Sequence, residues 1–451
     1  MELNPARANL FVYLKSLGCA KNLVDSEVIQ GMLMHAGYAF TPLPELADII
    51  IVNTCAFIED ATREALDAIL TLAEHKRTGS CRHLIVCGCL PQRYKESLAA
   101  ELPEVDLFIG TGAFQHITRL LKNLQTGSAR SKIYVDRPTF LLSAKTPRIL
   151  GTPSYTAYVK IAEGCAHRCT YCTIPAIRGP YNSRPLRSVV QEVKNLAAMG
   201  VKEINLIAQD TTQYGVDRGD RADLIRLLKE LVRIPNIEWF RLLYCHPLTI
   251  TSEIISLIAR EHKICRYLDI PVQHISDSVL KRMGRKMTGQ HIRRLVQQLR
   301  ESMPDMVLRT TVMVGFPGET ERDFSELLAF MKEVQFDYAG VFRYRDEEGT
   351  VAVKLLPKVA ERVKDERYQT IMKLQASISL QKNRRRVGQK VSVLVEGPVR
   401  KRGFALQGRT SFQAPEVDGV MYMEQGSATA GSMVMAQITR GLTYDLVGEI
   451  V

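Results

Sequence analysis

The sequence predicts an α/β protein with three parts: an N-terminal domain built on a parallel sheet (residues 1–130), a central partial barrel of the TIM type that is open on one side (151–385), and a small C-terminal all-β barrel (386–451). Strand and helix patterns alternate along the first two parts, and such repeats give parallel sheets covered by helices. The last part has short β-branched runs divided by glycines, which is typical of a small barrel. A length of 451 residues fits about three domains.

The first domain alternates four strands with four helices. Its strands are predicted at residues 10–14, 48–52, 84–86 and 107–109, and its helices at 22–35, 58–76, 92–100 and 114–124. The strand at 48–52 is apolar on both faces, as expected inside a parallel sheet. Residues 129–153 lose this periodicity and carry three prolines, so we interpret them as a linker.

The second series has six strands, fewer than the eight of a closed TIM barrel. They are predicted at residues 157–161, 203–208, 239–243, 267–270, 308–314 and 338–342. A long charged helix at 360–386 then leads into the C-terminal barrel. The predicted barrel is therefore open on one side.

Composition sets further limits. Apolar residues make up 46% of the chain, which excludes global disorder. The longest uncharged apolar stretches are far shorter than a membrane span, and residues 1–7 lack the apolar core of a signal peptide. We therefore expect a soluble, cytoplasmic protein, in which ten cysteines indicate metal binding or catalysis rather than disulfides.

Cys165, Cys169 and Cys172 form a C-x3-C-x2-C run directly after the first strand of the second series. Three thiolates on one short loop can bind three irons of a four-iron cluster and leave the fourth iron open to a small chelating molecule. A zinc site is the alternative, but it requires a fourth ligand, and His167 is poorly placed to supply one on so tight a loop.

Cys19, Cys55 and Cys89 are far apart in sequence, yet each one follows a predicted strand and precedes a helix. The carboxyl ends of parallel strands share one edge of the sheet, where ligands bind. The three thiols can therefore converge on a second three-ligand cluster. The alternative is three unrelated buried cysteines, and we interpret Cys81 and Cys87 in that structural way.

Together the two cysteine sets make the chain similar to the methylthiotransferase family of radical S-adenosylmethionine enzymes. The strongest segments are SLGCAKNLVDSE at 16–27, NTCA at 53–56, GCAHRCTYCTIPAIRG at 164–179, YLDIPVQH at 267–274 and RTTVMVGFPGET at 309–320. The resemblance covers nearly the whole chain. It implies an N-terminal cluster domain, a radical S-adenosylmethionine barrel and a C-terminal TRAM barrel.

The resemblance also implies the chemistry. Cys19, Cys55 and Cys89 would hold an auxiliary four-iron cluster that presents sulfur, and Cys165, Cys169 and Cys172 would hold the cluster that cleaves S-adenosyl-L-methionine to a radical. No side-chain acid or base removes an unactivated C–H hydrogen, so a cofactor must supply that radical. The family inserts a methylthio group at a C–H bond. Sulfur and electron donors are expected partners that the sequence does not identify.

Members of this family modify either an aspartate of the small-subunit ribosomal protein twelve or an adenosine of transfer RNA. IAQDTTQYG at 207–215 and APEVDG at 414–419 resemble the ribosomal-protein branch, the RimO branch, because the transfer-RNA branch typically has Asn where Asp210 stands. The ribosomal protein is the predicted substrate and transfer RNA the alternative. A more remote alternative is an iron–sulfur redox sensor or electron carrier with an RNA-binding tail.

Further candidate residues end barrel strands or follow the cysteine run. Candidate cofactor contacts are Tyr171, Arg184, Gln209 and Gly315, and candidate substrate contacts are Asp210 and Tyr214. Three of them have a plainer alternative: packing for Tyr171, solvation for Arg184, and helix capping by Glu319 or Thr320 for the turn at Gly315. Cys245 and His246 follow a barrel strand, where a ligand or redox role competes with simple substitution.

The location of the net charge of +12 favours a protein substrate. Residues 151–360 carry +6 and residues 361–390 carry another +6, whereas residues 391–451 carry −1. A tail that grips RNA phosphates should be basic, because phosphate neutralisation dominates that affinity. A slightly acidic tail suits a basic ribosomal protein better, and the basic helix could still touch ribosomal RNA nearby.

Overall fold

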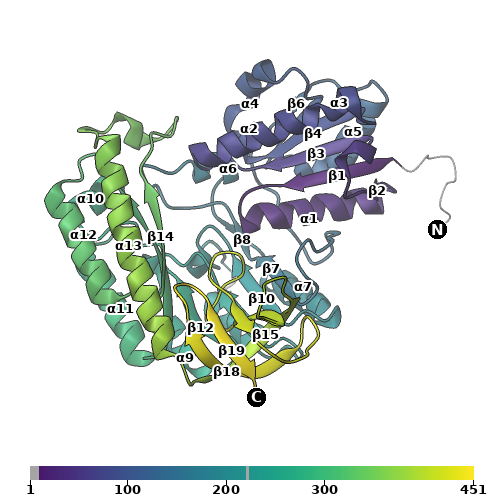
Figure 1. The fold of residues 1–451 in the computed structure, drawn as a ribbon. Helices are drawn as coiled ribbons and strands as arrows, with labels where there is room; N and C mark the ends of the chain where they lie inside the picture. The colour runs from purple at the N-terminus through teal and green to yellow at the C-terminus, as the bar shows by residue number, and fades with distance from the viewer. Residues whose placement is uncertain (1–9, 220–222) are drawn as a thin grey trace. The chain divides into compact units, whose positions relative to one another are not determined.

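A computed structural model describes residues 10–219 and 223–451 (Figure 1). Within these residues the chain forms two compact units. The first contains residues up to 152 together with 160–167 and 172–189, and the second contains residues 153–159, 168–171 and 190–451. Among the described residues, no helix combines the length and the apolar character needed to span a membrane.

The first unit is built on a six-stranded sheet in which all paired strands are parallel. In spatial order its strands are β2 (Ala39–Phe40), β1 (Phe11–Ser16), β3 (Ile49–Thr54), β4 (His83–Gly88), β5 (Leu107–Gly110) and β6 (Ile133–Tyr134). Every residue of β3 is buried, as its continuous apolar run predicts for a central strand. The parallel-sheet prediction for this region is confirmed.

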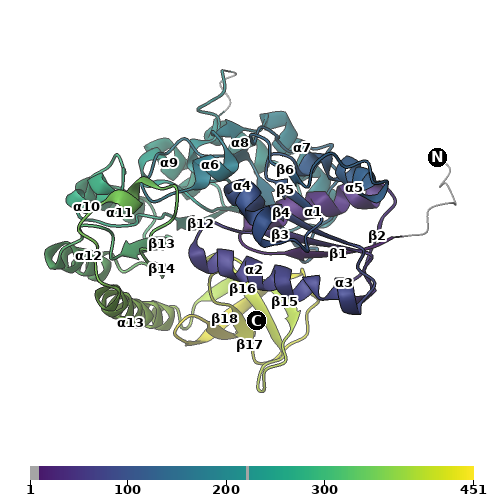
Figure 2. The same ribbon diagram turned by 90° about the horizontal axis from the view of Figure 1, so that it is seen from above.

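Helices cover both faces of this sheet (Figure 2). Helices α1 (Ala20–His35) and α5 (Ile117–Gln125) lie together, whereas α2 (Glu59–Ala73) and α4 (Cys89–Glu101) contribute to the core against the other face, with the short α3 (His75–Thr78) after α2. That core contains alternate residues of the central strands, including Ile50 and Val52. Alternation of this kind follows from the two-residue period of a strand.

The segment at 129–153 is more ordered than a linker. It supplies β6, which pairs with β5, and Arg148 forms an ion pair with Glu27 of α1. The Ile149 N–H also donates to the Glu27 carbonyl oxygen at 3.0 Å. Strands β2 and β6 have two residues each, too few for a period-2 pattern to be visible, so the sequence does not predict them.

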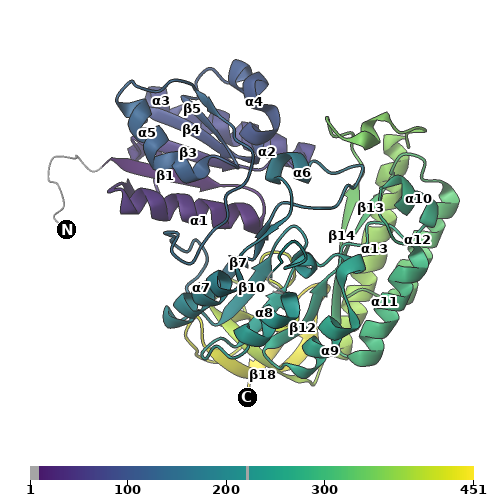
Figure 3. The same ribbon diagram turned by 180° about the vertical axis from the view of Figure 1, so that it is seen from behind.

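The second unit contains a six-stranded open sheet, visible from behind in Figure 3. Its strands lie in the order of the chain: β7 (Thr156–Lys160), β10 (Glu203–Ile207), β11 (Trp239–Leu242), β12 (Ile264–Asp269), β13 (Val307–Val314) and β14 (Tyr338–Arg343). The pairs from β10 to β14 are parallel. Strands β7 and β14 are the two edges, so the predicted open barrel is confirmed.

Helices connect the strands of this open barrel. They are α7 (Leu186–Ala198), α8 (Leu224–Leu231), α9 (Ser252–Arg260), α10 (Asp277–Arg282), α11 (Gly289–Ser302) and α12 (Glu321–Val334), followed by the long α13 (Glu361–Arg385). Helix α12 begins with a complete capping box, in which the Thr320 hydroxyl and the Asp323 carboxylate each accept a backbone N–H of the other. Helix α13 packs against β14 and leads to the C-terminal barrel.

Five strands close the C-terminal barrel. In spatial order they are β15 (Lys390–Pro398), β16 (Leu406–Thr410), β17 (Met421–Met423), β19 (Leu446–Ile450) and β18 (Met433–Gly441). Their inward side chains form a small core that contains Val393, Met421 and Ile438. Closure removes exposed strand edges, and the predicted all-β barrel is confirmed.

A buried ion cluster joins the two barrels of the second unit. Glu203 of β10 accepts hydrogen bonds from Arg241 of β11 at 3.0 Å and from Arg409 of β16 at 2.6 Å. Burial alone would raise the pKa of Glu203, but the two arginines lower it to about 2. The carboxylate therefore stays charged and fixes the small barrel to the open one.

Candidate active site

The loops that carry Cys19, Cys55 and Cys89 meet at the carboxyl edge of the first sheet. Cys19 follows β1 and caps α1, Cys55 follows β3, and Cys89 follows β4 as the first residue of α4. The thiols of Cys55 and Cys89 share a hydrogen bond, and Cys19 lies close enough to Cys55 to interact with it electrostatically. The structure thus brings together three residues that are widely separated in sequence.

Glycines make this approach possible. Gly18 has φ +91°, and a Cβ built there would lie 2.5 Å from the Cβ of Cys55. Gly88 has φ +98°, and its Cβ would lie 2.4 Å from Oδ1 of Asn53. Only glycine tolerates both the left-handed backbone and the missing space. The Gly-Cys pairs at 18–19 and 88–89 are therefore packing requirements of the three-cysteine site.

Buried amides hold the same loops. Asn22 donates from Nδ2 to the Leu17 carbonyl oxygen at 2.6 Å and to the Thr54 carbonyl oxygen at 3.2 Å. Asn53 donates from Nδ2 to the Asn22 carbonyl oxygen at 2.9 Å. These bonds tie the Cys19 loop to the Cys55 loop, and they account for the asparagines in the KN and NTC segments.

The electrostatics of Cys55 and Cys89 suit metal binding. The hydrogen bond from Cys55, together with the Arg178 guanidinium, lowers the pKa of Cys89 to about 6 although burial opposes this. The same hydrogen bond and burial raise the pKa of Cys55. Thiolates are the form that binds iron, and a low-pKa thiolate beside two further thiols fits a three-cysteine iron–sulfur site.

Cys81 and Cys87 have surroundings that differ from those of the three site cysteines. Cys81 precedes β4 and Cys87 lies within it, and both are buried. Burial raises the pKa of each thiol. Their surroundings therefore favour the neutral thiol, as expected for packing residues.

The run at 165–172 is held between two short strands. Strand β8 (Ala162–Glu163) pairs antiparallel with β9 (Asn182–Ser183), and the Cys165 N–H donates to the Gly179 carbonyl oxygen at 3.2 Å. Gly164 has φ +72°, and a Cβ there would lie 2.1 Å from the Pro180 carbonyl oxygen. All three cysteines are half-buried. A tight turn thus presents three accessible thiols on one short segment.

Two candidate cofactor contacts, Tyr171 and Arg184, have well-defined surroundings. The Tyr171 ring packs edge-on against Phe316 with 6.3 Å between centroids, and its hydroxyl accepts from Arg285 at 3.4 Å. Arg184 is buried, so the solvated alternative is wrong for this residue. Its guanidinium donates to the Lys160 carbonyl oxygen at 2.7 Å and to the Ser188 hydroxyl at 3.1 Å.

The turn at Gly315 closes on itself. Gly315 has φ +74°, and its N–H donates to the Glu319 carboxylate, as does the Phe316 N–H at 3.0 Å. The side chain of Thr320 caps α12. Capping therefore accounts for much of the GFPGET motif, and a cofactor contact at Gly315 stays a prediction.

The candidates at the end of β10 lie in a polar turn. Asp210 is buried and accepts hydrogen bonds from the N–H of Thr212 at 3.1 Å and from its hydroxyl at 2.7 Å. Tyr214 is buried, and Gln209 is half-buried. Asp210 thus orders the turn after the strand, and the substrate-binding roles of Asp210 and Tyr214 stay predictions.

Cys245 and His246 follow β11. Cys245 is buried, its N–H donates to the Asp269 carbonyl oxygen at 2.8 Å, and burial raises the pKa of its thiol. The His246 ring accepts the Leu248 N–H at 3.3 Å and caps a short turn of 3₁₀ helix. Both residues thus have local structural roles.

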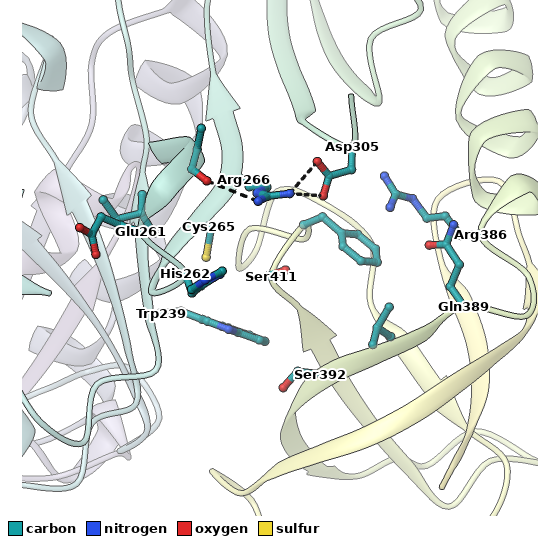
Figure 4. Close-up of a pocket in the computed structure, with 14 residues that line it drawn as sticks. Trp239, Glu261, His262, Cys265, Arg266, Asp305, Arg386, Gln389, Ser392 and Ser411 are labelled. Atoms are coloured by element: carbon teal, nitrogen blue, oxygen red, sulfur yellow. Dashed lines mark hydrogen bonds and ion pairs between the residues drawn. The ribbon is translucent and has the colours of Figure 1, made fainter. Parts of the chain in front are cut away.

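A cavity of about 410 Å³ lies at the amino-terminal ends of the strands of the second unit's sheet (Figure 4). It is lined by Trp239 and Ile264, the first residues of β11 and β12, and by Phe412 of the small barrel. Arg266 and Asp305 pair across its rim at 2.9 Å. Catalytic groups of such barrels stand at the carboxyl ends of the strands, so this cavity is remote from the chemistry.

Sequence reasoning missed buried charges near Cys89. Asp25, Lys160 and Arg178 form ion pairs inside the first unit. A lysine at the end of an apolar strand was the available signal, because charged side chains are almost never fully buried unless they are paired. No pattern in the sequence indicates which partners they choose.

Family models match three consecutive regions of the chain. Residues 11–110 match the uncharacterized protein family UPF0004, residues 159–331 match the radical SAM superfamily, and residues 387–451 match the TRAM domain. These regions correspond to the first sheet, the open barrel and the closed barrel.

Curated relatives decide the family. The chain is 50% identical over 440 residues to the ribosomal protein uS12 methylthiotransferase RimO of Geobacter sulfurreducens, with 98% of each chain covered. It is 49% identical to the protein of the same name from Pelobacter propionicus, with 97% of each chain covered. The chain belongs to the RimO methylthiotransferase family. The resemblance based on the two cysteine sets is thereby confirmed.

Membership of the RimO family makes the chain a radical S-adenosylmethionine methylthiotransferase that uses S-adenosyl-L-methionine and two four-iron clusters. Solved structures agree on the fold. The radical S-adenosylmethionine methyltransferase TsrM from Kitasatospora setae is similar with a TM-score of 0.57 at 18% identity, covering 74% of this chain and 73% of that one. The cobalamin-dependent radical enzyme OxsB gives 0.52 at 14% identity, covering 81% and 56%.

Proposed function

We propose that this protein transfers a methylthio group to the β-carbon of an aspartate of ribosomal protein uS12. Relatives that match 98% of the chain carry this substrate in their names. The observation that carries the proposal is the convergence of Cys19, Cys55 and Cys89 at one sheet edge, separate from the run at 165–172. Two distinct three-cysteine sets suit a reaction that needs both a radical and a sulfur source.

The ligand assignment follows from these sets. Cys19, Cys55 and Cys89 would hold the auxiliary cluster, and Cys165, Cys169 and Cys172 would hold the cluster that binds S-adenosyl-L-methionine. When bound, the two clusters supply radical generation from S-adenosyl-L-methionine and delivery of sulfur. The chain's own contribution is to orient thiolates: Gly18, Gly88 and Asn22 fix the loops on which they stand.

Charge supports a protein substrate. The C-terminal barrel, residues 391–451, carries a net charge of −1, and its half-buried Asp418 accepts a hydrogen bond from the Tyr267 hydroxyl of the open barrel. An RNA-gripping tail would be basic. We also propose a cytoplasmic location beside the ribosome, with an external electron donor and an external sulfur donor.

Side-by-side substrate assays test the proposal. The reconstituted, reduced full-length protein would be incubated with S-adenosyl-L-methionine and either intact uS12 or unmodified transfer RNA. Mass spectrometry should find the methylthio group on an aspartate of uS12 and none on nucleosides. Modification of nucleosides alone would overturn the substrate. Absence of S-adenosyl-L-methionine cleavage would instead favour the redox-sensor alternative.

A further inference from the structure

Four charged side chains lie together in the first unit, three of them buried and Glu163 half-buried, and one of them contacts Cys89. Asp25 comes from α1, Lys160 from the end of β7, Glu163 from β8, and Arg178 is the last residue of α6 (Ile174–Arg178). Lys160 Nζ lies 2.5 Å from Oδ1 of Asp25 and 2.6 Å from Oε2 of Glu163. The side chains of Asp25, Lys160 and Arg178 are each at most 4% exposed. Water therefore screens these charges very little.

Arg178 uses its planar fork to reach a thiol. Nη1 donates to Oδ2 of Asp25 at 2.5 Å, and Nη2 donates to Oδ1 of Asn22 at 2.9 Å and to Sγ of Cys89 at 3.4 Å. The guanidinium remains protonated at all relevant pH values, so it places a permanent positive charge against this sulfur. Asp25 and Asn22 aim the fork, because each accepts one branch of it.

The balance of charges among these four side chains allows Arg178 to interact with the Cys89 sulfur. Lys160 is neutralised by two carboxylates, Asp25 and Glu163, at short distance. Arg178 shares only the second oxygen of Asp25 and stands 3.7 Å from Glu163. The four groups sum to zero before the thiolate of Cys89 is counted. A buried thiolate is costly without such a partner, and Arg178 is the partner that the fold provides.

The position of Arg178 in the chain also matters. It follows Cys172 by six residues, and the helix that carries it begins directly after the cysteine run. The segment that carries the radical-generating thiols therefore continues into the residue that contacts a thiol of the other set. One short stretch of chain serves both cysteine sets.

We propose that Arg178 sets the reduction potential of the auxiliary cluster, with Asp25 and Lys160 as its positioning residues. This inference rests on the proposed function, since it needs a cluster on Cys19, Cys55 and Cys89. A hydrogen bond and a fixed positive charge at a cluster sulfur stabilise the more negative, reduced state and so raise its potential. The structural alternative is that Arg178 only neutralises buried carboxylates.

A redox titration separates the two. Full-length protein with Cys165, Cys169 and Cys172 all changed to alanine would be reconstituted so that only the auxiliary cluster remains, and its potential followed by electron paramagnetic resonance. Arg178→Gln should lower the potential relative to this background. Arg178→Lys keeps the positive charge but loses the planar fork, so its reduction potential should lie between those of the background protein and Arg178→Gln. Asp25→Asn should raise the potential in the Arg178→Gln protein, where only a negative charge is lost, and should raise it less or lower it when Arg178 is present, because there the fork also loses its anchor.

Arg148→Gln is the matched control. Arg148 is a half-buried arginine of the same unit, and it pairs with Glu27 at 2.5 Å. The auxiliary cluster of the Arg148→Gln variant should have the same reduction potential as that of the background protein. An unchanged potential in Arg178→Gln at full iron content would overturn the inference. If Arg178→Gln takes up no iron, an unchanged potential in Arg178→Lys would overturn it.

Failure of the proposed function would look different. A background protein that binds no iron and sulfide would overturn the assignment of Cys19, Cys55 and Cys89 as ligands, whatever Arg178 does. Normal iron content with an Arg178-independent potential would overturn the role of Arg178 alone. Iron analysis before each titration distinguishes these results.

Discussion

The two cysteine sets that we propose as cluster ligands are assembled in different ways. Cys19, Cys55 and Cys89 stand on three loops that only the folded sheet brings together, and Cys55 and Cys89 are buried. Cys165, Cys169 and Cys172 stand on one short segment held by β8 and β9, and all three are half-buried. The first set depends on tertiary structure, whereas the second is nearly complete in its local sequence.

The two sets nevertheless share one feature, a glycine with positive φ directly before a cysteine. Cys19, Cys89 and Cys165 each follow a glycine with positive φ, packed so closely that a Cβ would collide with its neighbours. In the first set the colliding atoms belong to distant residues, whereas in the second they belong to the same segment. Damage to the first sheet should therefore disable sulfur delivery and leave the radical-generating loop intact.

The largest expected effect comes from removing one set at a time. Cys55→Ala should cost about half of the bound iron, because one of two four-iron clusters loses a ligand. Cys169→Ala should cost about the other half. Iron and sulfide analysis of reconstituted protein measures both. Cys87→Ala is the control, since Cys87 is buried within β4 and should leave the iron content unchanged.

The next largest effect concerns a part of the molecule outside both sets. Glu203→Gln leaves Arg241 and Arg409 buried without their shared carboxylate, and breaking such a pair costs about 3–5 kcal/mol. Chemical denaturation should show this loss. The wild-type contribution is present above the ordinary pKa of 4.5 and is lost as pH falls towards 2, because the folded-state pKa of Glu203 is lowered to about 2.

The control for Glu203 is Glu424→Gln, which removes an exposed ion pair with Arg440 of the same barrel and should cost about 0–1 kcal/mol. Both variants should keep the iron of the first cysteine set. Loss of that iron in Glu203→Gln would contradict the claim that iron binding by the first cysteine set is independent of the stability of the second unit.

A smaller effect tests the tertiary character of the first set. Gly88→Ala forces a Cβ to within 2.4 Å of Oδ1 of Asn53 at a positive φ, which should cost about 1–3 kcal/mol. Iron at the first set should fall while S-adenosyl-L-methionine cleavage persists. Gly200→Ala is a fair control, because Gly200 also has positive φ but its Cβ would meet nothing within 4 Å.

These contrasts explain what the sequence could predict. The local set was visible as a spacing, and the distributed set was visible only because Cys19, Cys55 and Cys89 each end a strand of a recognisable parallel sheet. The capping by Thr320 also followed from local pattern. Local sequence rules and the regular topology of parallel sheets were therefore enough to predict the fold and to single out the six candidate cysteines.

The sequence could not predict which charged side chains pair across the fold. Arg178 contacts Cys89 and Asp25, and Arg409 contacts Glu203, over separations that no periodicity encodes. Asp418 lies in the APEVDG segment that resembles the ribosomal-protein branch, and its carboxylate accepts a hydrogen bond from the distant Tyr267 hydroxyl at 2.7 Å. Whether a charged side chain is solvated or paired depends on the packed structure, and the sequence alone leaves this open.

The smallest expected effect is a pH dependence of the second unit. Burial raises the pKa of Asp418 from 3.8 to about 6. Its folded-state contribution is thus complete below pH 3.8 and is lost as pH rises through 6, with a slope of at most about 1.4 kcal/mol per pH unit. Asp418→Asn should remove this slope. Denaturation of both proteins between pH 4 and 7 measures it, and identical slopes would contradict the burial of a neutral carboxyl.

The most direct test of the two-set account follows both products in one reaction. Protein variants would be supplied with S-adenosyl-L-methionine, reductant and uS12, and 5′-deoxyadenosine and methylthio-aspartate would be quantified together. Cys55→Ala should still form 5′-deoxyadenosine but no methylthio-aspartate, and Cys169→Ala should form neither. Methylthio-aspartate from a protein in which Cys19, Cys55 and Cys89 are all alanine would contradict the assignment of sulfur delivery to the first set.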